Sequence, residues 1–264
     1  MALSLFNIFL YLMIAIAIIV FCTLYFVEAG YGMLVSERWG KLINNKIGWF
    51  FMEFPIFASM LCMWAFSPHR HEVVPLVFLI IFEIHYFQRV FIFPFLLQGK
   101  SKMPIGIMFM GIVFNLLNAL MQGYWIFYES FNVNYSAFGL HYTDITWLTS
   151  PHFIIGTLLF IVGMSINLHS DNVIRHLRKT STDTKHYLPK GGMFNFVTSA
   201  NYLGELMEWL GFAILTWSLA GFVFFIWTFA NLVPRANTLY HKYSSEFGIE
   251  MKERKLKRVI PFIY

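Results

Sequence analysis

The sequence predicts an all-α integral membrane protein with about seven transmembrane helices, its N-terminus outside and its C-terminus in the cytosol. Three observations support this fold class. Hydrophobic residues make up 58% of the 264 residues and charged ones only 12%, against about 45–50% and about 25% in soluble domains. The apolar runs are long and do not alternate, which predicts helices rather than barrel strands. The basic residues gather in alternate loops, which is typical of multi-pass proteins.

The spans follow one another along a single predicted domain, residues 1–264, without internal repeats. A membrane span needs about 20 apolar residues. The first stretch lacks a basic leader and a small-residue cleavage site, so it is expected to be retained as a helix. The apolar stretch 197–233 is too long for one helix, so we divide it into two spans near Ser218. The last of these helices can continue beyond the membrane into water. The expected spans are Leu3–Val27, Trp49–Phe66, Val73–Leu97, Ile105–Phe127, Trp147–Leu168, Val197–Trp217 and Leu219–Val233.

Basic charge sets the predicted orientation. Of the 19 Lys and Arg residues, all except Arg70 and Arg89 fall in odd-numbered loops or after the last span. Positive loops stay in the cytosol, so the N-terminus is expected outside. Two segments, 169–195 and 235–264, are strongly basic. They are either a topology signal that attracts anionic headgroups or a binding site for a phosphate-rich ligand, and both interpretations stay open.

A few ionisable residues interrupt the apolar runs: Glu53, Glu83, His85, Arg89, Glu205 and Glu208. A charge at the bilayer centre costs roughly 2.5–3.5 kcal/mol, so such side chains normally face the bundle interior. One interpretation is a set of salt bridges between helices. The other is catalytic, and it is stronger for Glu53, whose span carries no basic residue nearby. A buried protonated carboxyl can donate a proton toward a carbonyl group.

Several functions are disfavoured by the residues. The composition excludes a soluble enzyme and a nucleic-acid-binding module. Neither a Gly-rich dinucleotide turn nor a phosphate-binding loop is present, so a nucleotide would have to bind among the membrane helices. His69 and His71 form only a His-x-His pair, without a zinc-protease pattern, so we expect no metal.

Six segments together resemble the steroid 5-alpha-reductase family, in register from about Gly30 to Tyr264. This resemblance implies a multi-pass reductase that uses NADPH to saturate the delta-4 double bond of a 3-oxosteroid. Two departures from the family pattern concern the substrate end: Met110 replaces a basic residue, and NTLYHKY (237–243) replaces a histidine-rich stretch. The matching segments are WFFMEFPIF (49–57), HYFQRVFIF (85–93), LMQGYWIFY (120–128), INLHSDNVIRHLRK (166–179), YLPKGGMFNFVTSANYLGELMEWLGFAILTWS (187–218) and VIPFIY (259–264).

The resemblance also assigns roles to individual residues. It implies that Glu53 and Tyr86 hydrogen-bond the 3-keto oxygen, where two donors would stabilise the enolate formed by hydride attack on C5. Asn167 and Asp171 suit a ribose or adenine edge, Asn201 and Glu205 the nicotinamide carboxamide, and the arginines the phosphates. The implied cofactor residues are Arg89, Asn167, Asp171, Arg178, Tyr187, Asn201, Glu205, Arg235 and Tyr243.

Two other functions remain as alternatives. A related membrane reductase could act on another lipid enone, such as an enoyl-CoA, a polyprenol or a sterol. An isoprenylcysteine-type methyltransferase would use S-adenosylmethionine, whose lack of phosphates would leave the arginines without a ligand. We expect a monomer that binds a steroid or related lipid enone. Its membrane would be the cytoplasmic membrane in a bacterium and the endoplasmic reticulum in a eukaryote.

Overall fold

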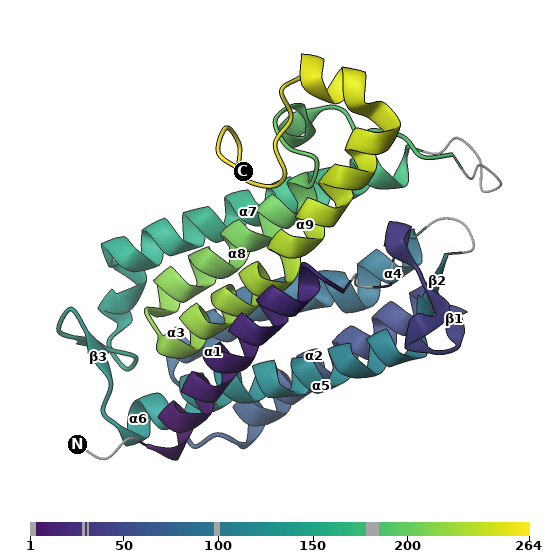
Figure 1. Ribbon diagram of the computed structural model, residues 1–264. Helices are drawn as coiled ribbons and strands as arrows, with labels where there is room; N and C mark the ends of the chain where they lie inside the picture. The colour runs from purple at the N-terminus through teal and green to yellow at the C-terminus, as the bar shows by residue number, and fades with distance from the viewer. Residues whose placement is uncertain (1–3, 28–29, 31, 98–100, 178–184) are drawn as a thin grey trace.

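Helices dominate the computed structural model, which describes residues 4–27, 30, 32–97, 101–177 and 185–264 (Figure 1). Between the helices lie two short antiparallel strand pairs, β1 (Leu42–Asn44) with β2 (Lys102–Pro104) and β3 (Ser136–Ala137) with β4 (Leu140–His141). The α-helices are α1 (Leu5–Leu24), α2 (Asn45–Phe66), α3 (Val73–Phe87), α4 (Phe93–Leu96), α5 (Ile105–Tyr124), α6 (Ser130–Asn132), α7 (Pro151–Arg175), α8 (Ala200–Thr216) and α9 (Leu219–Glu253).

The predicted all-α membrane fold is confirmed. Six of the described helical segments are long and apolar enough to cross a membrane. The remaining predicted span, Val197–Trp217, corresponds to α8, which has 17 residues and is therefore slightly short by length alone. Helix α9 is kinked at Phe247, where the backbone leaves the helical conformation. The part before the kink, residues 219–246, measures roughly 42 Å at 1.5 Å per residue, so this helix extends beyond a bilayer core of about 30 Å.

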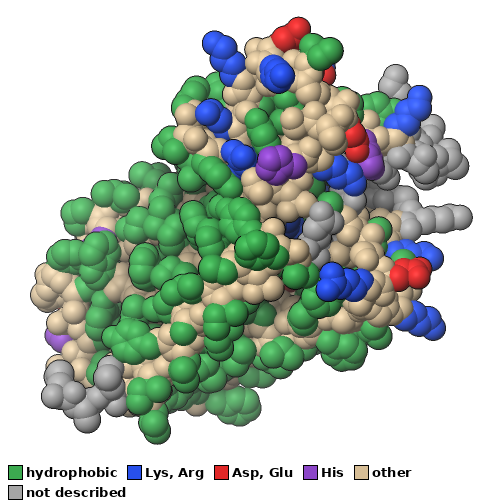
Figure 2. Space-filling model, in the orientation of Figure 1, with side chains coloured by type: hydrophobic (Ala, Val, Ile, Leu, Met, Phe, Trp, Pro, Cys, Tyr) green, Lys and Arg blue, Asp and Glu red, His purple; other side chains and the backbone are tan. Residues whose placement is uncertain are grey.

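The helices form one bundle with a basic end. In Figure 1, α7, α8 and α9 lie side by side, α1 packs on α9, and α2 pairs with α5. Helices α1 and α7 end, and α2, α5 and α8 begin, at the end that carries the basic loops. Figure 2 shows Lys and Arg gathered there, whereas green apolar side chains cover the length of the bundle. We call this the basic end. The apolar cover, which includes Ile18 and Ile155, is suited to lipid.

Helices α7 and α8 touch backbone to backbone. A Cβ atom on Gly163 of α7 would lie 2.5 Å from the Glu208 nitrogen and 2.6 Å from the Gly204 oxygen. One on Gly156 would lie 2.4 Å from the Leu215 nitrogen. Only glycine permits this approach, because no side chain could rotate away from backbone atoms. The close contact fixes the polar residues of these two helices relative to one another.

Two local irregularities lie beside predicted site residues. Pro55 sits inside α2, where it cannot donate the hydrogen bond of a regular helix, two residues after Glu53. Between α3 and α4 the chain forms a π-helical segment, Gln88–Ile92, that contains Arg89. Such segments insert an extra residue into a turn and often occur at functional sites.

Candidate active site

Helix α5 brings Glu53 and Tyr86 into one buried region. Glu53 lies on α2 and Tyr86 on α3, with 8% and 3% of their surfaces exposed. The Asn115 amide nitrogen donates to Glu53 Oε2 at 3.0 Å and to the Met52 carbonyl at 2.7 Å. One turn further on, the Asn118 amide donates to the Tyr86 hydroxyl oxygen at 3.3 Å. Two amides on one face of α5 therefore hold the acid and the phenol.

This row of amides on α5 was missed by the sequence prediction. It continues to Gln122, whose amide donates to Asn118 at 3.4 Å and to the Ala220 carbonyl at 2.9 Å. Asn118 and Gln122 are fully buried. Asn118 follows Asn115 by three residues and Gln122 follows Asn118 by four, which puts all three on one helical face. Three amides at that spacing in an apolar run are a signal that could have found them.

Two further ionisable residues on α3 behave differently. His85 hydrogen-bonds Glu208 of α8, which has no exposed surface. This pair joins α3 to α8, as the structural interpretation of the membrane charges expected. Glu83 is also buried, yet neither of its carboxyl oxygens has a hydrogen-bond partner among the described residues. Among the described residues, Glu83 and Arg89 therefore form no ion pair with each other.

Arg89 is held in place by a carboxylate and two aromatic rings. Its Nη1 atom lies 3.6 Å from Asp171 Oδ2. Its guanidinium carbon lies 4.6 Å from the centre of the Trp49 ring and 4.3 Å from that of Phe93. Stacking of this kind suits the planar, weakly hydrated guanidinium group. A cation is thus fixed beside α7 at the basic end.

The predicted cofactor residues of α7 and α8 are joined to this cation. Asn167 donates to the Asn201 carbonyl at 3.0 Å, and the Asn201 side chain lies near the Asp171 carboxylate. Glu205, one turn after Asn201, interacts electrostatically with Arg89. The structure therefore brings Arg89, Asn167, Asp171, Asn201 and Glu205 together, as one polar region between three helices.

Several buried polar atoms in this part of the fold lack hydrogen-bond partners within the described chain. They are Ser170 Oγ and Arg175 Nη1 on α7 and Ser199 Oγ just before α8. Buried polar groups are normally paired, and leaving one unpaired costs about 1–3 kcal/mol. A mixed set of donors and acceptors fits a ligand with hydroxyl and phosphate groups, such as a dinucleotide.

The remaining predicted cofactor residues lie outside that region. Arg235 of α9 is 7% exposed and donates from Nε to the Tyr202 hydroxyl of α8. Tyr243 is buried in a separate apolar cluster with Leu188, and Tyr187 is 37% exposed. Arg178 lies outside the described residues. Arg235 and Tyr243 thus lie on α9 beyond its predicted membrane span, and Tyr187 lies beside this part of the helix, next to Leu188.

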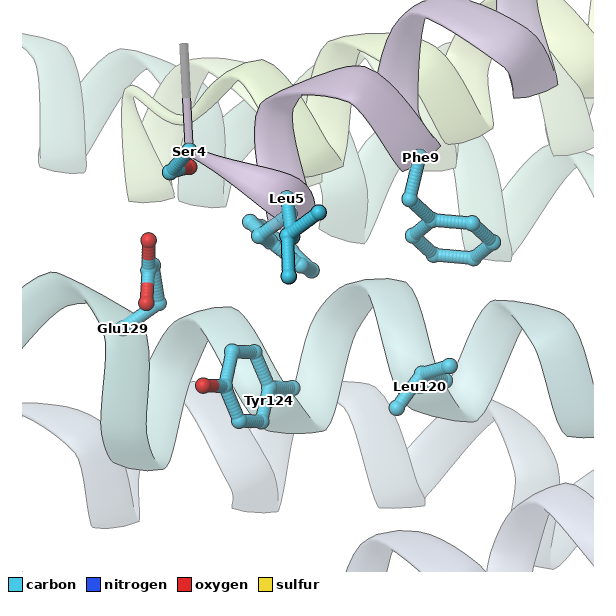
Figure 3. Close-up of a pocket in the computed structure, with 7 residues that line it drawn as sticks. Ser4, Leu5, Phe9, Leu120, Tyr124 and Glu129 are labelled. Carbon is cyan, nitrogen blue, oxygen red and sulfur yellow. The ribbon is translucent and has the colours of Figure 1, made fainter. Parts of the chain in front are cut away.

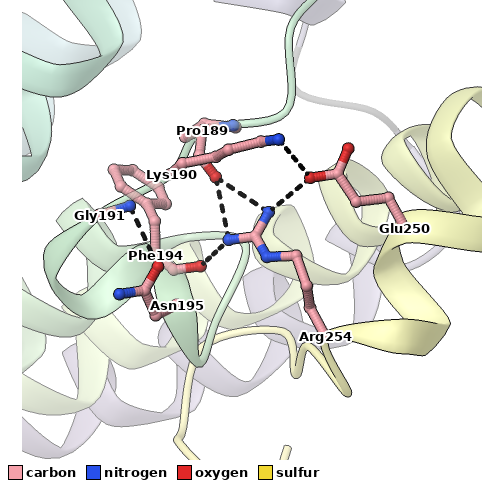
Figure 4. A network of polar contacts seen from close by, with 7 residues as sticks. All are labelled: Pro189, Lys190, Gly191, Phe194, Asn195, Glu250 and Arg254. Carbon is pink, nitrogen blue, oxygen red and sulfur yellow. Dashed lines mark hydrogen bonds and ion pairs between the residues drawn. The ribbon is translucent and has the colours of Figure 1, made fainter.

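A network of polar contacts pins the segment that follows Tyr187 to α9 (Figure 4). Arg254 donates to the Phe194 carbonyl at 2.9 Å and to the Pro189 carbonyl at 3.4 Å. Glu250 pairs with Arg254 at 3.2 Å and with Lys190 Nζ at 2.8 Å. These contacts fold residues 189–194 against the helix that carries Arg235.

A cavity lies at the other end of the bundle. It has a volume of about 370 Å³ and opens between the start of α1 and the end of α5. Figure 3 shows the Glu129 carboxylate turned toward Ser4, with Leu5, Phe9 and Leu120 forming apolar walls. None of the predicted site residues lines it. Among the described residues there is no group of three or more His, Cys, Asp or Glu side chains that could hold a metal ion.

The chain is similar to known reductases over nearly its whole length. The sequence model of the 3-oxo-5-alpha-steroid 4-dehydrogenase family matches residues 101–264. A steroid 5-alpha-reductase of Gossypium hirsutum is 36% identical, covering 99% of this chain and 98% of its own. The 3-oxo-5-alpha-steroid 4-dehydrogenase 1 of Mus musculus is 35% identical, covering 94% and 92%. That of Homo sapiens is 34% identical, covering 96% and 93%.

These similarities confirm the resemblance seen in the six sequence segments, and they do not support the methyltransferase alternative. They also agree with a multi-pass helical membrane architecture. The chain belongs to the steroid 5-alpha-reductase family of membrane oxidoreductases.

Proposed function

We propose that this protein uses NADPH to reduce the delta-4 double bond of a 3-oxosteroid to the 5-alpha product. The observation that carries the proposal is the pair of α5 amides, which hold Glu53 and Tyr86 in one apolar interior. A protonated carboxyl and a phenol are neutral donors that can be buried there without an unpaired charge.

Glu53 and Tyr86 would both donate to the 3-keto oxygen. Asn115 donates to one carboxyl oxygen of Glu53, so the other oxygen can carry the proton that is offered to the substrate. Asn118 donates to the oxygen of Tyr86, so the phenolic proton remains available. Two donors on one carbonyl polarise the enone and stabilise the negative charge that develops on oxygen. The carbon C4 is then protonated by water or a nearby acid.

NADPH would supply a hydride to C5 of the enone. Its polar parts would be held by the region that joins Arg89, Asn167, Asp171, Asn201 and Glu205. Next to these residues in the chain, Ser170, Arg175 and Ser199 have buried polar atoms without hydrogen-bond partners among the described residues.

The phosphates would lie toward the basic segments, where Arg178 and Arg235 are expected to bind them. Tyr187 and Tyr243 would flank this part of the site along the extension of α9. The basic charge available there supports NADPH as the cofactor.

We also propose a cytosolic position for the basic end, which leaves the N-terminus outside and the C-terminus inside. In this arrangement the cofactor reaches the site from the cytosol, and the steroid from the lipid. The chain would act as a single-domain monomer, in the cytoplasmic membrane of a bacterium or the endoplasmic reticulum of a eukaryote.

Product analysis tests the proposed reaction. The purified protein is incubated with testosterone or progesterone and NADPH deuterated at C4 of the nicotinamide, and products are compared with 5-alpha and 5-beta standards. A 5-alpha product with deuterium at C5 supports the proposal. A 5-beta product contradicts it. NADPH binding without any product would indicate that the substrate is another lipid enone.

A further inference from the structure

The segment after α9, residues 257–264, folds back onto the bundle as a closed hook. Thr198 donates its backbone N–H to the Lys257 carbonyl at 2.9 Å, and Ser199 donates to that of Arg258 at 3.1 Å. The N–H groups of Val259 and Ile260 both donate to the carbonyl oxygen of Tyr264 at 2.8 Å. This hook, residues 257–264, is therefore a fixed structure attached to the start of α8.

The hook has an apolar inner face and an apolar outer face. Val259 is fully buried, and it packs in a cluster with Val197 and Val233. Phe262 and Ile263 point the other way and are 78% and 76% exposed. Large apolar side chains grouped on an ordered surface mark a contact with lipid or with another protein.

The position of the hook favours lipid. The Tyr264 hydroxyl lies 3.0 Å from that of Tyr25, which directly follows α1. The 20 residues of α1 measure about 30 Å, the thickness of the hydrocarbon core. The end of α1, and with it the hook, therefore lies at the boundary between hydrocarbon and headgroups. Figure 1 shows the hook returning from the far end of α9 toward α7.

The residues around the outer face are those of a membrane interface. The Phe196 ring, 42% exposed, lies 5.5 Å from that of Phe262. Tyr25 is 42% exposed as well. The guanidinium of Arg258 lies 4.7 Å from the centre of the Tyr264 ring, which keeps a cation beside the aromatic group. Aromatic rings with neighbouring basic residues are enriched where a protein meets lipid headgroups.

We propose that the hook is an interfacial anchor that inserts Phe262 and Ile263 into the leaflet at the basic end of the bundle. The partner is the lipid surface itself, at the boundary between headgroups and acyl chains. Burying two large apolar side chains there stabilises the inserted position. Because the hook is hydrogen-bonded to Thr198 and Ser199, the anchor also fixes the start of α8 relative to the bilayer.

Spin labelling tests the anchor directly and does not depend on the reaction. Cys22 and Cys62 are exposed and are replaced by serine. A nitroxide is attached to Ile263→Cys in one variant and to Ile249→Cys in another, in vesicles of phosphatidylcholine and phosphatidylglycerol. Ile249 is a matched control, because it is 79% exposed and lies far along α9. Ile19→Cys, on an exposed position of α1 five residues before its end, gives the lipid reference.

Collisions of the label with oxygen and with a water-soluble nickel chelate report its surroundings. We expect the label at position 263 to collide more with oxygen than with nickel, as at position 19, and the label at 249 to show the reverse. A label at 263 that behaves like that at 249 would overturn the anchor. So would dipolar broadening at 263 that is lost on dilution with unlabelled protein, because it would show a second copy covering the hook.

Discussion

The close contact between α7 and α8 predicts that Gly163→Ala lowers both the stability and the turnover of the protein, although it adds only one methyl group. The new Cβ would lie 2.5 Å from the Glu208 nitrogen. Ordinary contacts begin at 3.4 Å, so the shortfall is 0.9 Å. The obstructing atoms belong to the backbone of α8, and no change of rotamer can relieve the overlap. The two helices must therefore move apart by about 1 Å.

The expected cost has two parts. Overpacking of a dense contact typically costs about 1–3 kcal/mol of folding free energy. The movement also displaces Asn167, one turn from Gly163, from the Asn201 carbonyl that it contacts at 3.0 Å. A misplacement of about 1 Å in a site can cost about 10²-fold in rate. We expect both a lower thermal unfolding temperature and at least a tenfold loss of turnover.

The assay compares thermal unfolding and steroid reduction of Gly163→Ala with those of Gly248→Ala. Gly248 lies on α9, and a Cβ there would have no atom within 4 Å. Alanine at that position should be neutral or stabilise the helix by up to about 1 kcal/mol, with normal turnover. Wild-type stability and turnover in Gly163→Ala would refute the argument from backbone contact.

Three other experiments, with four substitutions between them, test separate parts of the site. Asn118→Leu removes the hydrogen bond to Tyr86, so kcat should fall about fivefold for a loss of about 1 kcal/mol. An unchanged kcat would show that Asn118 does not position the phenol. Glu208→Leu leaves His85 without its hydrogen-bond partner and should destabilise the fold by about 1–3 kcal/mol, the cost of an unpaired buried polar group. Adding His85→Leu should recover part of that loss in thermal unfolding; no recovery would argue against the pair. Arg178→Ala should raise the KM for NADPH more than that for steroid, and an unchanged NADPH KM would leave Arg178 as a topology signal.

The spans and their order were predictable because hydropathy alone specifies them. The division between the last two spans was also predicted at the right place. There Trp217 takes a left-handed conformation with φ of 46°, and the Ser218 hydroxyl accepts the Gly221 N–H at 3.0 Å. A serine that caps a helix is recognisable in sequence. The exact length of α8 was less predictable, because helix ends depend on local packing.

The site was predictable only in part. Resemblance indicated Glu53 and Tyr86, but not the amides of α5 that hold them, since pairing between helices depends on how the bundle packs. The sequence suggested salt bridges between helices without naming the partners. The structure pairs Arg89 with Asp171 of α7. Likewise, the glycines of α7 and α8 acquire their meaning only once the two helices are seen to touch.

The central claim is that Glu53 acts on the substrate carbonyl and not on the cofactor. The most direct measurement compares Glu53→Gln with the wild-type protein for NADPH binding and for single-turnover reduction of a delta-4 3-oxosteroid. Glutamine keeps an N–H donor but cannot offer an acidic proton, and the loss of general-acid assistance typically costs about 10²–10⁴-fold in rate. We predict a loss of that size with an unchanged Kd for NADPH. Turnover at the wild-type rate, or loss of NADPH binding, would contradict the account.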